Sequence, residues 1–385
     1  MMTYSRPFLA LSLPAFALAS CANAEMGDSS SADPADFTFD VEEMAEFNEP
    51  WAIEFAPGTE TIFITEKSGE MKFMNTATGT VGTVSGVPEV AYGGQGGLGD
   101  VAFLESEASD DLSERTIYLS WAEAGDGGFG AAVGRGTLSC DSETTCTISG
   151  MDVIWRQSLK TGRKGHYSHR IVFSPDEQHM FISSGDRQEL EPAQDNTNNL
   201  GTIVRLNLDG TPAEGNPFAD EGEIQSQIWS YGHRNLLGMD FDTEGRLWDV
   251  EHGPAGGDEL NLVKVGTNYG WPTVSDGDHY NGNPIPDHET RPEFATAAIG
   301  WTPVIAPGDM IFYKGDMFEA WQGDALITGL GAQALVQVDI EGDTATEVAR
   351  HELGGRLRSV EEGPDGSIWV AADGPGGKLF KLSAD

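Results

Sequence analysis

A turn-and-strand unit recurs along this chain, and its recurrence constrains the fold more than any other feature. Each copy places a turn rich in Pro, Asp or Gly before a short apolar strand. Self-similarity of this kind is the sequence signature of repeat architectures such as propellers. Six copies span roughly 330 residues, which leaves room for four strands per repeat. The strand segments are Ile62–Thr65, Arg115–Ser120, Met180–Ser183, Leu247–Val250, Gly323–Thr328 and Ile368–Ala371.

Glycine content and hydrophobic spacing agree with an all-β chain. The 49 glycines serve as turn and close-packing residues, and no window sustains the 3.6-residue apolar spacing of a helix. We therefore predict an all-β fold, a six-bladed β-propeller of four-stranded blades over residues 37–385. A β-sandwich with long loops remains as the alternative. In a propeller, distant loops gather at one end of a central channel, where we expect the functional residues.

The charge of the chain excludes one class of partner. Its 22 Lys and Arg residues stand against 62 Asp and Glu residues, which gives a net charge of −40. Such a charge repels phosphate backbones and anionic lipid surfaces, so we expect no nucleic-acid partner. Because 39% of the residues are hydrophobic, the chain can still bury a core, and the acidity indicates a solvated surface rather than disorder.

The N-terminal segment has the layout of a secretory signal peptide over residues 1–24. A basic residue, Arg6, precedes an apolar run from Pro7 to Ala19 that is too short to span a membrane stably. Leu18–Cys21 matches a bacterial lipobox, which predicts a diacylglycerol on Cys21, whereas Ala22–Ala24 offers an ordinary cleavage site. Residues 25–36 are predicted to form a flexible tether. We expect an exported protein, periplasmic or anchored to the outer membrane as a lipoprotein.

Two cysteines remain once Cys21 is set aside with the leader. Cys140 and Cys146 lie six positions apart in a segment dense with Ser, Thr and Asp. An oxidising compartment favours a disulfide between them, which would staple a single hairpin and gain little entropy because the closed loop is short. Two free thiols are the alternative.

Several motifs appear in a fixed order between Gly93 and Arg358. They are Gly94–Gly99, Gly165–Arg170, Ser184–Arg187, Trp229–Asn235, Asp249–Asn261 with Asn268–Pro272, Trp301–Pro303 and Arg356–Arg358. In this order they resemble the motifs of the soluble aldose and glucose dehydrogenases that depend on pyrroloquinoline quinone (PQQ). The resemblance implies a Ca²⁺- and PQQ-dependent oxidoreductase that converts the C1 hydroxyl of aldose sugars to lactones by hydride transfer. Electrons would pass to an external acceptor that the sequence does not identify.

Two histidines compete for the role of catalytic base. The family places this histidine four residues before an arginine, which is His166 relative to Arg170. The chain departs from the family pattern at Ser168 and His169, where two glycines are usual, so His169 is a second candidate. A histidine suits the role because its pKa lies near neutrality and its neutral ring can accept a proton.

The resemblance also implies a set of cofactor contacts. PQQ has three carboxylates, and guanidinium groups bind carboxylates through two hydrogen bonds. Cofactor binding is therefore a physical reason for arginines in an otherwise acidic protein. Side chains alternate along a strand, so Arg356 and Arg358 should share a face. Trp301 stands where the family packs an aromatic ring near the cofactor, and a core position is its alternative. The implied cofactor-binding residues are Gln95, Arg187, Arg234, Asn235, Trp301, Arg356 and Arg358.

The segment Asp249–Asn261 resembles the calcium loop of the family. Hard Ca²⁺ takes carbonyl and carboxylate oxygens, and a Gly-Pro turn can direct two successive carbonyls, those of Gly253 and Pro254, at one ion. The family places a second ion on residues matching Glu259 and Tyr269, and Asp258 completes the predicted metal residues. The loop Gly329–Gln333 lacks the lysine of the glucose-specific members, which favours the broader aldose branch.

Two other functions remain open because fold does not fix function. Six-bladed propellers also serve as calcium-dependent lactonases and as non-catalytic ligand-binding modules. A lactonase needs metal ligands but no carboxylate clamp, so Arg234, Arg356 and Arg358 argue against it. A binding propeller anchored as a lipoprotein would bind PQQ and Ca²⁺ poorly or not at all.

Overall fold

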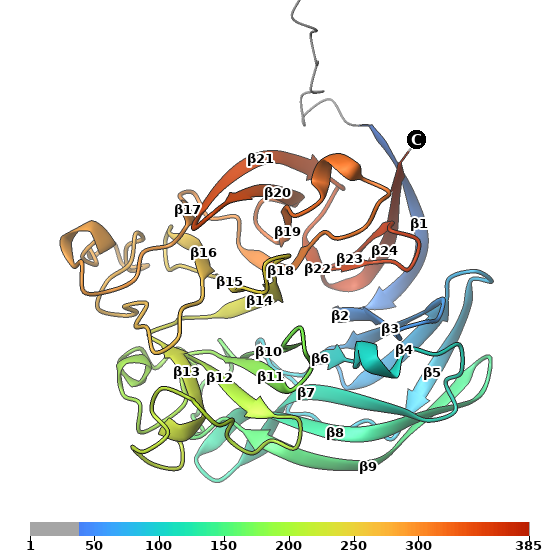
Figure 1. Ribbon diagram of the computed structural model, residues 1–385, viewed down its shortest axis with the longest axis horizontal. Coiled ribbons are helices and arrows are strands. Elements are labelled where there is room, and N and C mark those ends of the chain that lie inside the picture. The colour runs from blue at the N-terminus through green and yellow to red at the C-terminus, as the bar shows by residue number, and fades with distance from the viewer. Residues whose placement is uncertain (1–37, 385) are drawn as a thin grey trace, which may run out of the picture.

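The computed structural model describes residues 38–384, and regular structure there is almost entirely β-strand (Figure 1). The strands form antiparallel groups of four. In order of first strand, the groups are β2 (Pro50–Phe55), β3 (Thr61–Glu66), β4 (Glu70–Asn75) and β5 (Thr80–Ser85); β6 (Leu98–Ala102), β7 (Arg115–Gly125), β8 (Gly128–Ser142) and β9 (Thr145–Arg156); β10 (Ser168–Phe173), β11 (His179–Ser184), β12 (Thr202–Asn207) and β13 (Ile228–Tyr231); β14 (Leu236–Phe241), β15 (Leu247–Glu251), β16 (Asp258–Leu262) and β17 (Ile299–Trp301); β18 (Pro307–Phe312), β19 (Ala325–Gly329), β20 (Ala334–Glu341) and β21 (Thr344–Glu352); β22 (Leu357–Glu362), β23 (Ile368–Ala372) and β24 (Pro375–Ala384) with β1 (Phe39–Asn48).

Helical structure in residues 38–384 is limited to single 3₁₀ turns, as the absence of helical periodicity predicts. They are η2 (Glu105–Glu107), η3 (Glu191–Gln194), η4 (Gln225–Gln227), η5 (His288–Thr290) and η6 (Glu319–Trp321). None of the helices in this part of the chain is long and apolar enough to cross a membrane.

The recurring sequence unit falls on the same strand of every group. Each of the six copies lies on the second strand, namely β3, β7, β11, β15, β19 or β23. These strands are rich in apolar residues because both of their faces are covered; all residues of β3, β15 and β19 are buried. The repeat therefore reports a strand buried on both sides.

The sheets are arranged in a ring around a common centre (Figure 1). The first strand of each group contacts the first strand of the next, and β22 contacts β2. Strands β5 and β9 pair in parallel at their outer edge, so the first two groups form one eight-stranded sheet. The arrangement is that of a β-propeller.

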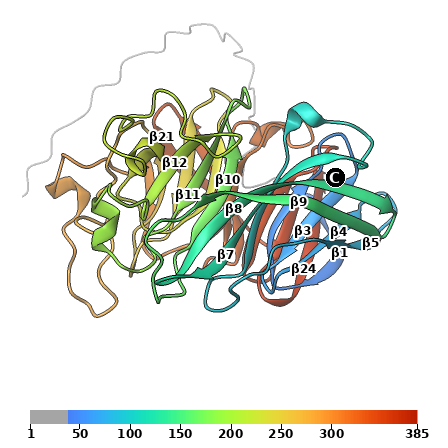
Figure 2. The same ribbon diagram turned by 90° about the horizontal axis from the view of Figure 1, so that it is seen from below.

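The two ends of the described chain meet in one sheet. Strand β1 pairs antiparallel with β24 from Phe39 opposite Ala384 to Asn48 opposite Pro375, and the two lie side by side in both views (Figure 2). The N-terminal strand thus supplies the fourth strand of the last group and covers an edge that would otherwise be exposed.

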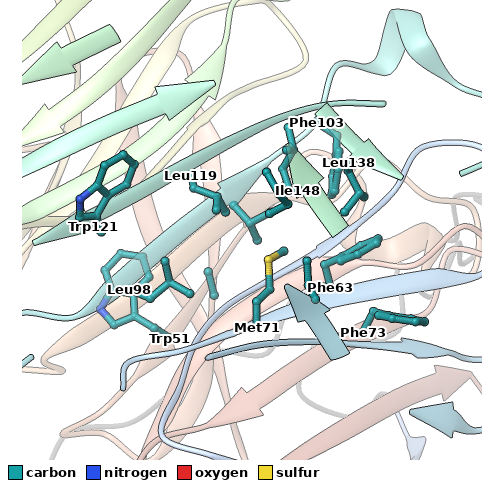
Figure 3. Packing of buried hydrophobic residues seen from close by; sticks show 14 of the residues in the cluster. Trp51, Phe63, Met71, Phe73, Leu98, Phe103, Leu119, Trp121, Leu138 and Ile148 are labelled. Atoms are coloured by element: carbon teal, nitrogen blue, oxygen red, sulfur yellow. The ribbon is translucent and has the colours of Figure 1, made fainter. Parts of the chain in front are cut away.

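Hydrophobic side chains fill the wedges between adjacent sheets. Figure 3 shows the largest such cluster, in which Trp51, Phe63 and Met71 of the first group pack against Leu119 and Ile148 of the second. All five side chains are buried. Packing of this kind, rather than any local propensity, sets the angle between neighbouring sheets.

The predicted disulfide between Cys140 and Cys146 is confirmed. The two residues are cross-strand partners in the β8–β9 hairpin, close to where β9 meets β5. The predicted leader (1–24) and tether (25–36) lie outside the described residues, as do the lipobox cysteine and the boundary residues 37 and 385.

Candidate active site

Chain direction explains why motifs far apart in sequence converge. The first strands of successive groups lie side by side around the centre, and each is antiparallel to the second strand of its own group. The residues just before a first strand and just after a second strand therefore meet at the same end of the channel. Gln95, His166, Asn235 and Arg356 precede first strands, and Asp186 follows a second strand.

His166 and Asp186 form a buried hydrogen-bonded pair. Nδ1 of His166 lies 2.7 Å from Oδ1 of Asp186, whose Oδ2 accepts a hydrogen bond from the indole N–H of Trp271 at 2.7 Å. Burial acts to raise the pKa of Asp186, but the hydrogen bonds from His166 and Trp271 outweigh it and hold the pKa below its usual value. Because Asp186 is ionised, Nδ1 of His166 carries the proton and Nε2 is the basic nitrogen.

The environment of His166 keeps its imidazole neutral at pH 7. Burial lowers the pKa of His166, and the neighbouring Arg234 and Arg187 lower it further, while Asp186 acts in the opposite direction. The backbone N–H of His166 donates to Oε1 of Gln95 at 2.6 Å, which fixes the loop against the first channel motif. A neutral ring with a free Nε2 is the form that a general base requires.

His169 lines the 300 Å³ cavity described below, but its ring is held by packing. Its ring stacks on Trp51 with centroids 5.0 Å apart, and its Nδ1 lies 2.8 Å from the hydroxyl of Ser120. That hydroxyl already accepts a hydrogen bond from the backbone N–H of Asp100, so its own proton is free to donate to Nδ1. Burial lowers the pKa of His169 to about 3, far below the range that suits a base near neutrality.

The backbone of the histidine loop explains the departure from the family pattern. Ser168 and His169 have φ of 57° and 64°, and His166 has φ of 48°. These left-handed conformations are free for glycine and strained for other residues. Glycines at positions 168 and 169 would adopt this conformation without strain, whereas this chain holds it with the larger Ser168 and His169.

A cavity of about 300 Å³ lies beside this loop and brings together five predicted or neighbouring polar residues. Gln95, Asn235, Arg356 and Arg358 line it, and Asp373 lies between the two arginines. Asp373 accepts from Nε of Arg356 at 2.9 Å and from Nε and Nη2 of Arg358 at 3.0 and 2.8 Å. The predicted shared face of the two arginines is therefore present, with a carboxylate that orients both.

Arg234 and His252 occupy the wall next to the calcium-loop motif. Nη1 of Arg234 donates to the carbonyl of His252 at 3.0 Å, and its buried Nε has no hydrogen-bond partner. His252 lines the 300 Å³ cavity and also a more open cavity of about 580 Å³ along Gly253–Pro254. Its Nε2 lies 2.7 Å from the carbonyl of Pro307, and burial lowers its pKa to about 3. His252 is thus a neutral donor at the junction of the two cavities.

Three of the predicted cofactor residues, Arg187, Arg234 and Trp301, do not line the 300 Å³ cavity. The guanidinium of Arg187 is fully buried over the ring of Tyr167 and donates to the carbonyls of Gly165, Arg163 and Phe129. It therefore braces the loop that carries His166. Trp301 is 5% exposed in the core between neighbouring sheets, and its indole N–H donates to Glu347 at 2.7 Å.

The Gly253–Pro254 turn is held by the predicted metal residue Asp258. Oδ1 of Asp258 accepts from the backbone N–H of Gly253 at 2.8 Å, and Oδ2 accepts from Ala306 N–H at 2.6 Å. Burial raises the pKa of Asp258 to about 6 although these donors act to lower it. The carboxylate of Asp258 is thus occupied in holding the turn. The candidate metal ligands are the backbone carbonyls of Gly253 and Pro254.

Glu259 and Tyr269 lie on either side of His288. Nε2 of His288 lies 3.1 Å from the carbonyl oxygen of Tyr269, and its Nδ1 lies 3.9 Å from Oε1 of Glu259. The phenol O–H of Tyr269 donates a hydrogen bond to the carbonyl of Leu262. The backbone oxygen of Tyr269 is therefore the group that faces His288. Burial, followed by the charge of Glu251, raises the pKa of Glu259 well above its usual value, as expected for a carboxylate without a cation.

Sequence reasoning missed three residues that complete the site. Asp186 and His252 stood inside quoted motifs without a role, and Asp373 stood outside every motif. Position gives a usable signal, because Asp186, His252 and Asp373 all follow second strands at the channel end. A search of the residues after each repeat copy would have found them.

The chain matches a family model and proteins of that family over most of its length. The model described as Glucose / Sorbosone dehydrogenase matches residues 47–381. Aldose sugar dehydrogenase YliI of Escherichia coli (strain K12) is 36% identical over 340 residues, covering 87% of this chain and 90% of that protein.

Solved structures give the same picture. The soluble aldose sugar dehydrogenase of Escherichia coli in its apo-form matches with a TM-score of 0.84 at 35% identity, covering 90% of this chain and 100% of that one. The PQQ-bound form of an aldose sugar dehydrogenase from Streptomyces coelicolor matches with a TM-score of 0.71 at 25% identity, covering 92% and 100% of the two chains.

Proposed function

This chain belongs to the glucose/sorbosone dehydrogenase family, and on that premise we propose that it is a PQQ- and Ca²⁺-dependent oxidoreductase that oxidises the C1 hydroxyl of aldoses to lactones. The observation that carries the proposal is the buried His166–Asp186 pair, at 2.7 Å, together with the cavity lined by Gln95, Asn235, Arg356 and Arg358. Gln95 links the two, because its Oε1 accepts a hydrogen bond from the backbone N–H of His166 at 2.6 Å. A buried, neutral base linked in this way to a cationic cavity suits the oxidation of a sugar hydroxyl on an anionic cofactor.

The cavity residues fit a cofactor with several carboxylates. Lys67, Arg356 and Arg358 bring three cationic side chains to one cavity in a chain of net charge −40. Of the nearby carboxylates, Asp373 orients the two arginines and Glu49 lies 4.0 Å from the lysine. Fork-shaped guanidinium donors favour the bidentate binding of carboxylates. Asn235 and Gln95 add amide groups for the remaining oxygens.

The Gly253–Pro254 turn fits a calcium ion next to that cofactor. Its two carbonyls belong to a rigid turn pinned by Asp258, and carbonyl oxygens are ligands that Ca²⁺ prefers. Glu259 and the backbone oxygen of Tyr269 are proposed to hold a second ion. The raised pKa of Glu259, which follows from burial and from nearby carboxylates, supports a cation there.

His166 supplies the proton transfer of the reaction. The cavity residues and the Gly253–Pro254 turn would hold PQQ and Ca²⁺, which would supply a hydride acceptor for C1 and a Lewis acid that polarises it. Nε2 of His166 takes the proton of the C1 hydroxyl as the C1–H bond breaks, so the sugar loses two electrons and two hydrogens and becomes a lactone. Asp186 keeps the ring oriented and stabilises its protonated form. The electrons then leave to an external acceptor.

We propose six blades for the propeller. Dividing the eight-stranded sheet at the parallel β5–β9 contact leaves six antiparallel groups of four, each with one copy of the sequence repeat. The closed order of contacts between first strands supports the division.

Export and anchoring remain proposals from the leader sequence. The apolar run ending before Cys21 supports secretion to the periplasm, with either a lipidated Cys21 or cleavage after Ala24. The Cys140–Cys146 disulfide fits an oxidising compartment. Mass spectrometry of the native N-terminus decides between an acylated Cys21 and an unmodified start at Glu25, and the latter would reject the anchor.

Reconstitution tests the proposed function. We expect the purified chain with PQQ and Ca²⁺ to reduce an artificial dye with several aldoses, because the loop Gly329–Gln333 has no lysine to confine it to glucose. Exhaustive chelation with EDTA should abolish both cofactor retention and activity, and Ca²⁺ should restore them. Full activity after chelation would reject the calcium proposal, and inactivity with every aldose would reject the dehydrogenase.

A further inference from the structure

Four polar side chains share one face of the β15–β16 hairpin next to the proposed active site. Asp249 and Glu251 alternate on β15, and their cross-strand partners on β16 are Asn261 and Glu259. A fifth residue, His233, reaches them from the segment that follows β13 in the neighbouring sheet (Figure 1). We call these five residues the interblade cluster.

The interblade cluster buries three carboxylates with little compensating charge. Asp249, Asn261 and His233 are fully buried, and Glu251 and Glu259 are 4% and 7% exposed. In residues 38–384, no Lys or Arg forms an ion pair with any of the three carboxylates. Burial, followed by the charges of Glu251 and Glu259, raises the pKa of Asp249 well above its usual value. Such a group needs a cation or a proton.

Hydrogen bonding within the cluster satisfies Glu251 and leaves Asp249 without partners. Glu251 accepts from the backbone N–H of Arg234 at 2.6 Å and lies 3.1 Å from Nδ1 of His233. Both carboxylate oxygens of Asp249 and the amide oxygen of Asn261 are buried with no hydrogen-bond partner. Buried polar atoms in native proteins are nearly always paired, so three unpaired oxygens in one place point to a missing ligand.

The spacing of the ligand atoms suits a single metal ion. One ligand atom each from His233, Asp249 and Glu251 lies within 4.8 Å of the other two. An ion about 2.0–2.4 Å from each ligand can bridge atoms separated by up to twice that distance. Nε2 of His233 lies 2.9 Å from the hydroxyl of Ser230, which holds the ring with Nδ1 toward the carboxylates.

We propose that His233, Asp249 and Glu251 hold a divalent metal ion, with the amide oxygen of Asn261 as a further ligand. The three proposed side-chain ligands are not those proposed for the Gly253–Pro254 turn or for the Glu259–Tyr269 pair. The sites are neighbours, because Glu259 belongs to the interblade cluster and the ring of Tyr269 stacks on His233 with centroids 4.5 Å apart. An imidazole nitrogen among oxygen ligands favours Mn²⁺ or Zn²⁺ over Ca²⁺. The ion would join two neighbouring sheets and fix Glu251, whose second oxygen holds the backbone of Arg234.

Metal counting on a matched pair of variants tests the site. The chain is stripped with a chelator in the absence of PQQ, then equilibrated with Mn²⁺, and bound Mn²⁺ per chain is measured with the thermal midpoint. Asp249→Asn removes the charge at constant shape. Asp324→Asn is the control, because Asp324 is a buried carboxylate that has its own partner, Gln337, at 2.6 Å.

We expect the wild type and Asp324→Asn to bind one more Mn²⁺ per chain than Asp249→Asn does. Without metal, Asp249→Asn should melt above the wild type because one buried charge is gone, and added Mn²⁺ should stabilise it less. Equal Mn²⁺ counts in all three proteins would overturn the proposal and indicate a shared proton instead.

A second measurement needs no variant. Anomalous scattering from wild-type crystals equilibrated with Mn²⁺ should show an ion between Asp249 and Nδ1 of His233, and no anomalous signal there would equally overturn the site. Either result is independent of dye reduction, so a failed dehydrogenase assay would leave this test unaffected.

Discussion

His166→Gln is expected to lower turnover with saturating aldose by about 10²–10⁴-fold while PQQ stays bound, because the loss of a general base typically costs that much. The glutamine amide cannot accept the C1 hydroxyl proton, but it retains the size of the ring beside Asp186. The measurement is kcat from dye reduction together with the stoichiometry of bound PQQ in the same preparation.

His169→Gln is the matched control, three residues away in the same loop. Its ring packs on Trp51 and carries a pKa of about 3, so we expect stability or cofactor affinity to change while much of the turnover remains. An inactive His169→Gln with an active His166→Gln would mean that the base has been assigned to the wrong histidine.

Arg170→Met is expected to destabilise the fold by about 3–5 kcal/mol, the usual cost of breaking a buried ion pair from one side. Nη1 of Arg170 donates to Asp100 at 2.8 Å, and its Nη2 lies 3.1 Å from Asp309. Its other donors reach the carbonyls of Leu237 and Gly308, so one side chain contacts the first strands of several groups. Both carboxylates would be left buried without a cationic partner, with only neutral donors such as the N–H of Ile171 and the hydroxyl of Ser359.

Urea unfolding with and without the substitution measures this cost. Arg135→Met is the control, since Arg135 is exposed on β8, and a surface change of this kind usually alters the free energy of unfolding by less than about 0.5 kcal/mol. A loss below about 1 kcal/mol for Arg170→Met would show that the channel-side network contributes little to the stability of the ring.

The sequence repeat predicted the fold because each copy falls on the second strand of a group, which is buried on both faces. A strand covered on both faces is rich in apolar residues, and a turn precedes it, so each group keeps one copy of the turn-and-strand unit in its sequence. The third and fourth strands lie nearer the outside and carry mixed residues, as in β21, where no residue is buried. These outer strands have no recurring sequence pattern. The sequence therefore indicates the number of repeats better than it indicates where each repeat begins and ends.

The sequence predicted site residues well where a motif fixes the backbone. It predicted them less well where the same side chain could pack either in the core or against a ligand. The motifs of the family resemblance predicted Gln95, Asn235, Arg356 and Arg358, and all four line one cavity. The first three precede first strands, and Arg358 is the second residue of β22. Trp301 is a case of the second kind, because a tryptophan has the same sequence signature whether it packs in the core or against a ligand.

Partnerships between distant residues were beyond the sequence. Arg187 has the charge of a cofactor ligand, yet its guanidinium donates to the backbone carbonyls of Gly165, in the loop of His166, and of Phe129, on β8. Asp373 is one acidic residue among many until the fold sets it between Arg356 and Arg358. The Asp373 pairing depends on the register of the β22–β23 hairpin, and the Arg187–Phe129 contact depends on the packing of two neighbouring sheets.

Single-turnover reduction of the bound cofactor tests the central claim most directly. The chain reconstituted with PQQ and Ca²⁺ is mixed rapidly with an aldose that carries either hydrogen or deuterium at C1, and the absorbance of the bound cofactor is followed. We predict that the spectrum changes to that of the reduced cofactor, more slowly with deuterium, and that the product is the lactone. A cofactor that binds but stays oxidised after mixing with every aldose tested would contradict the claim.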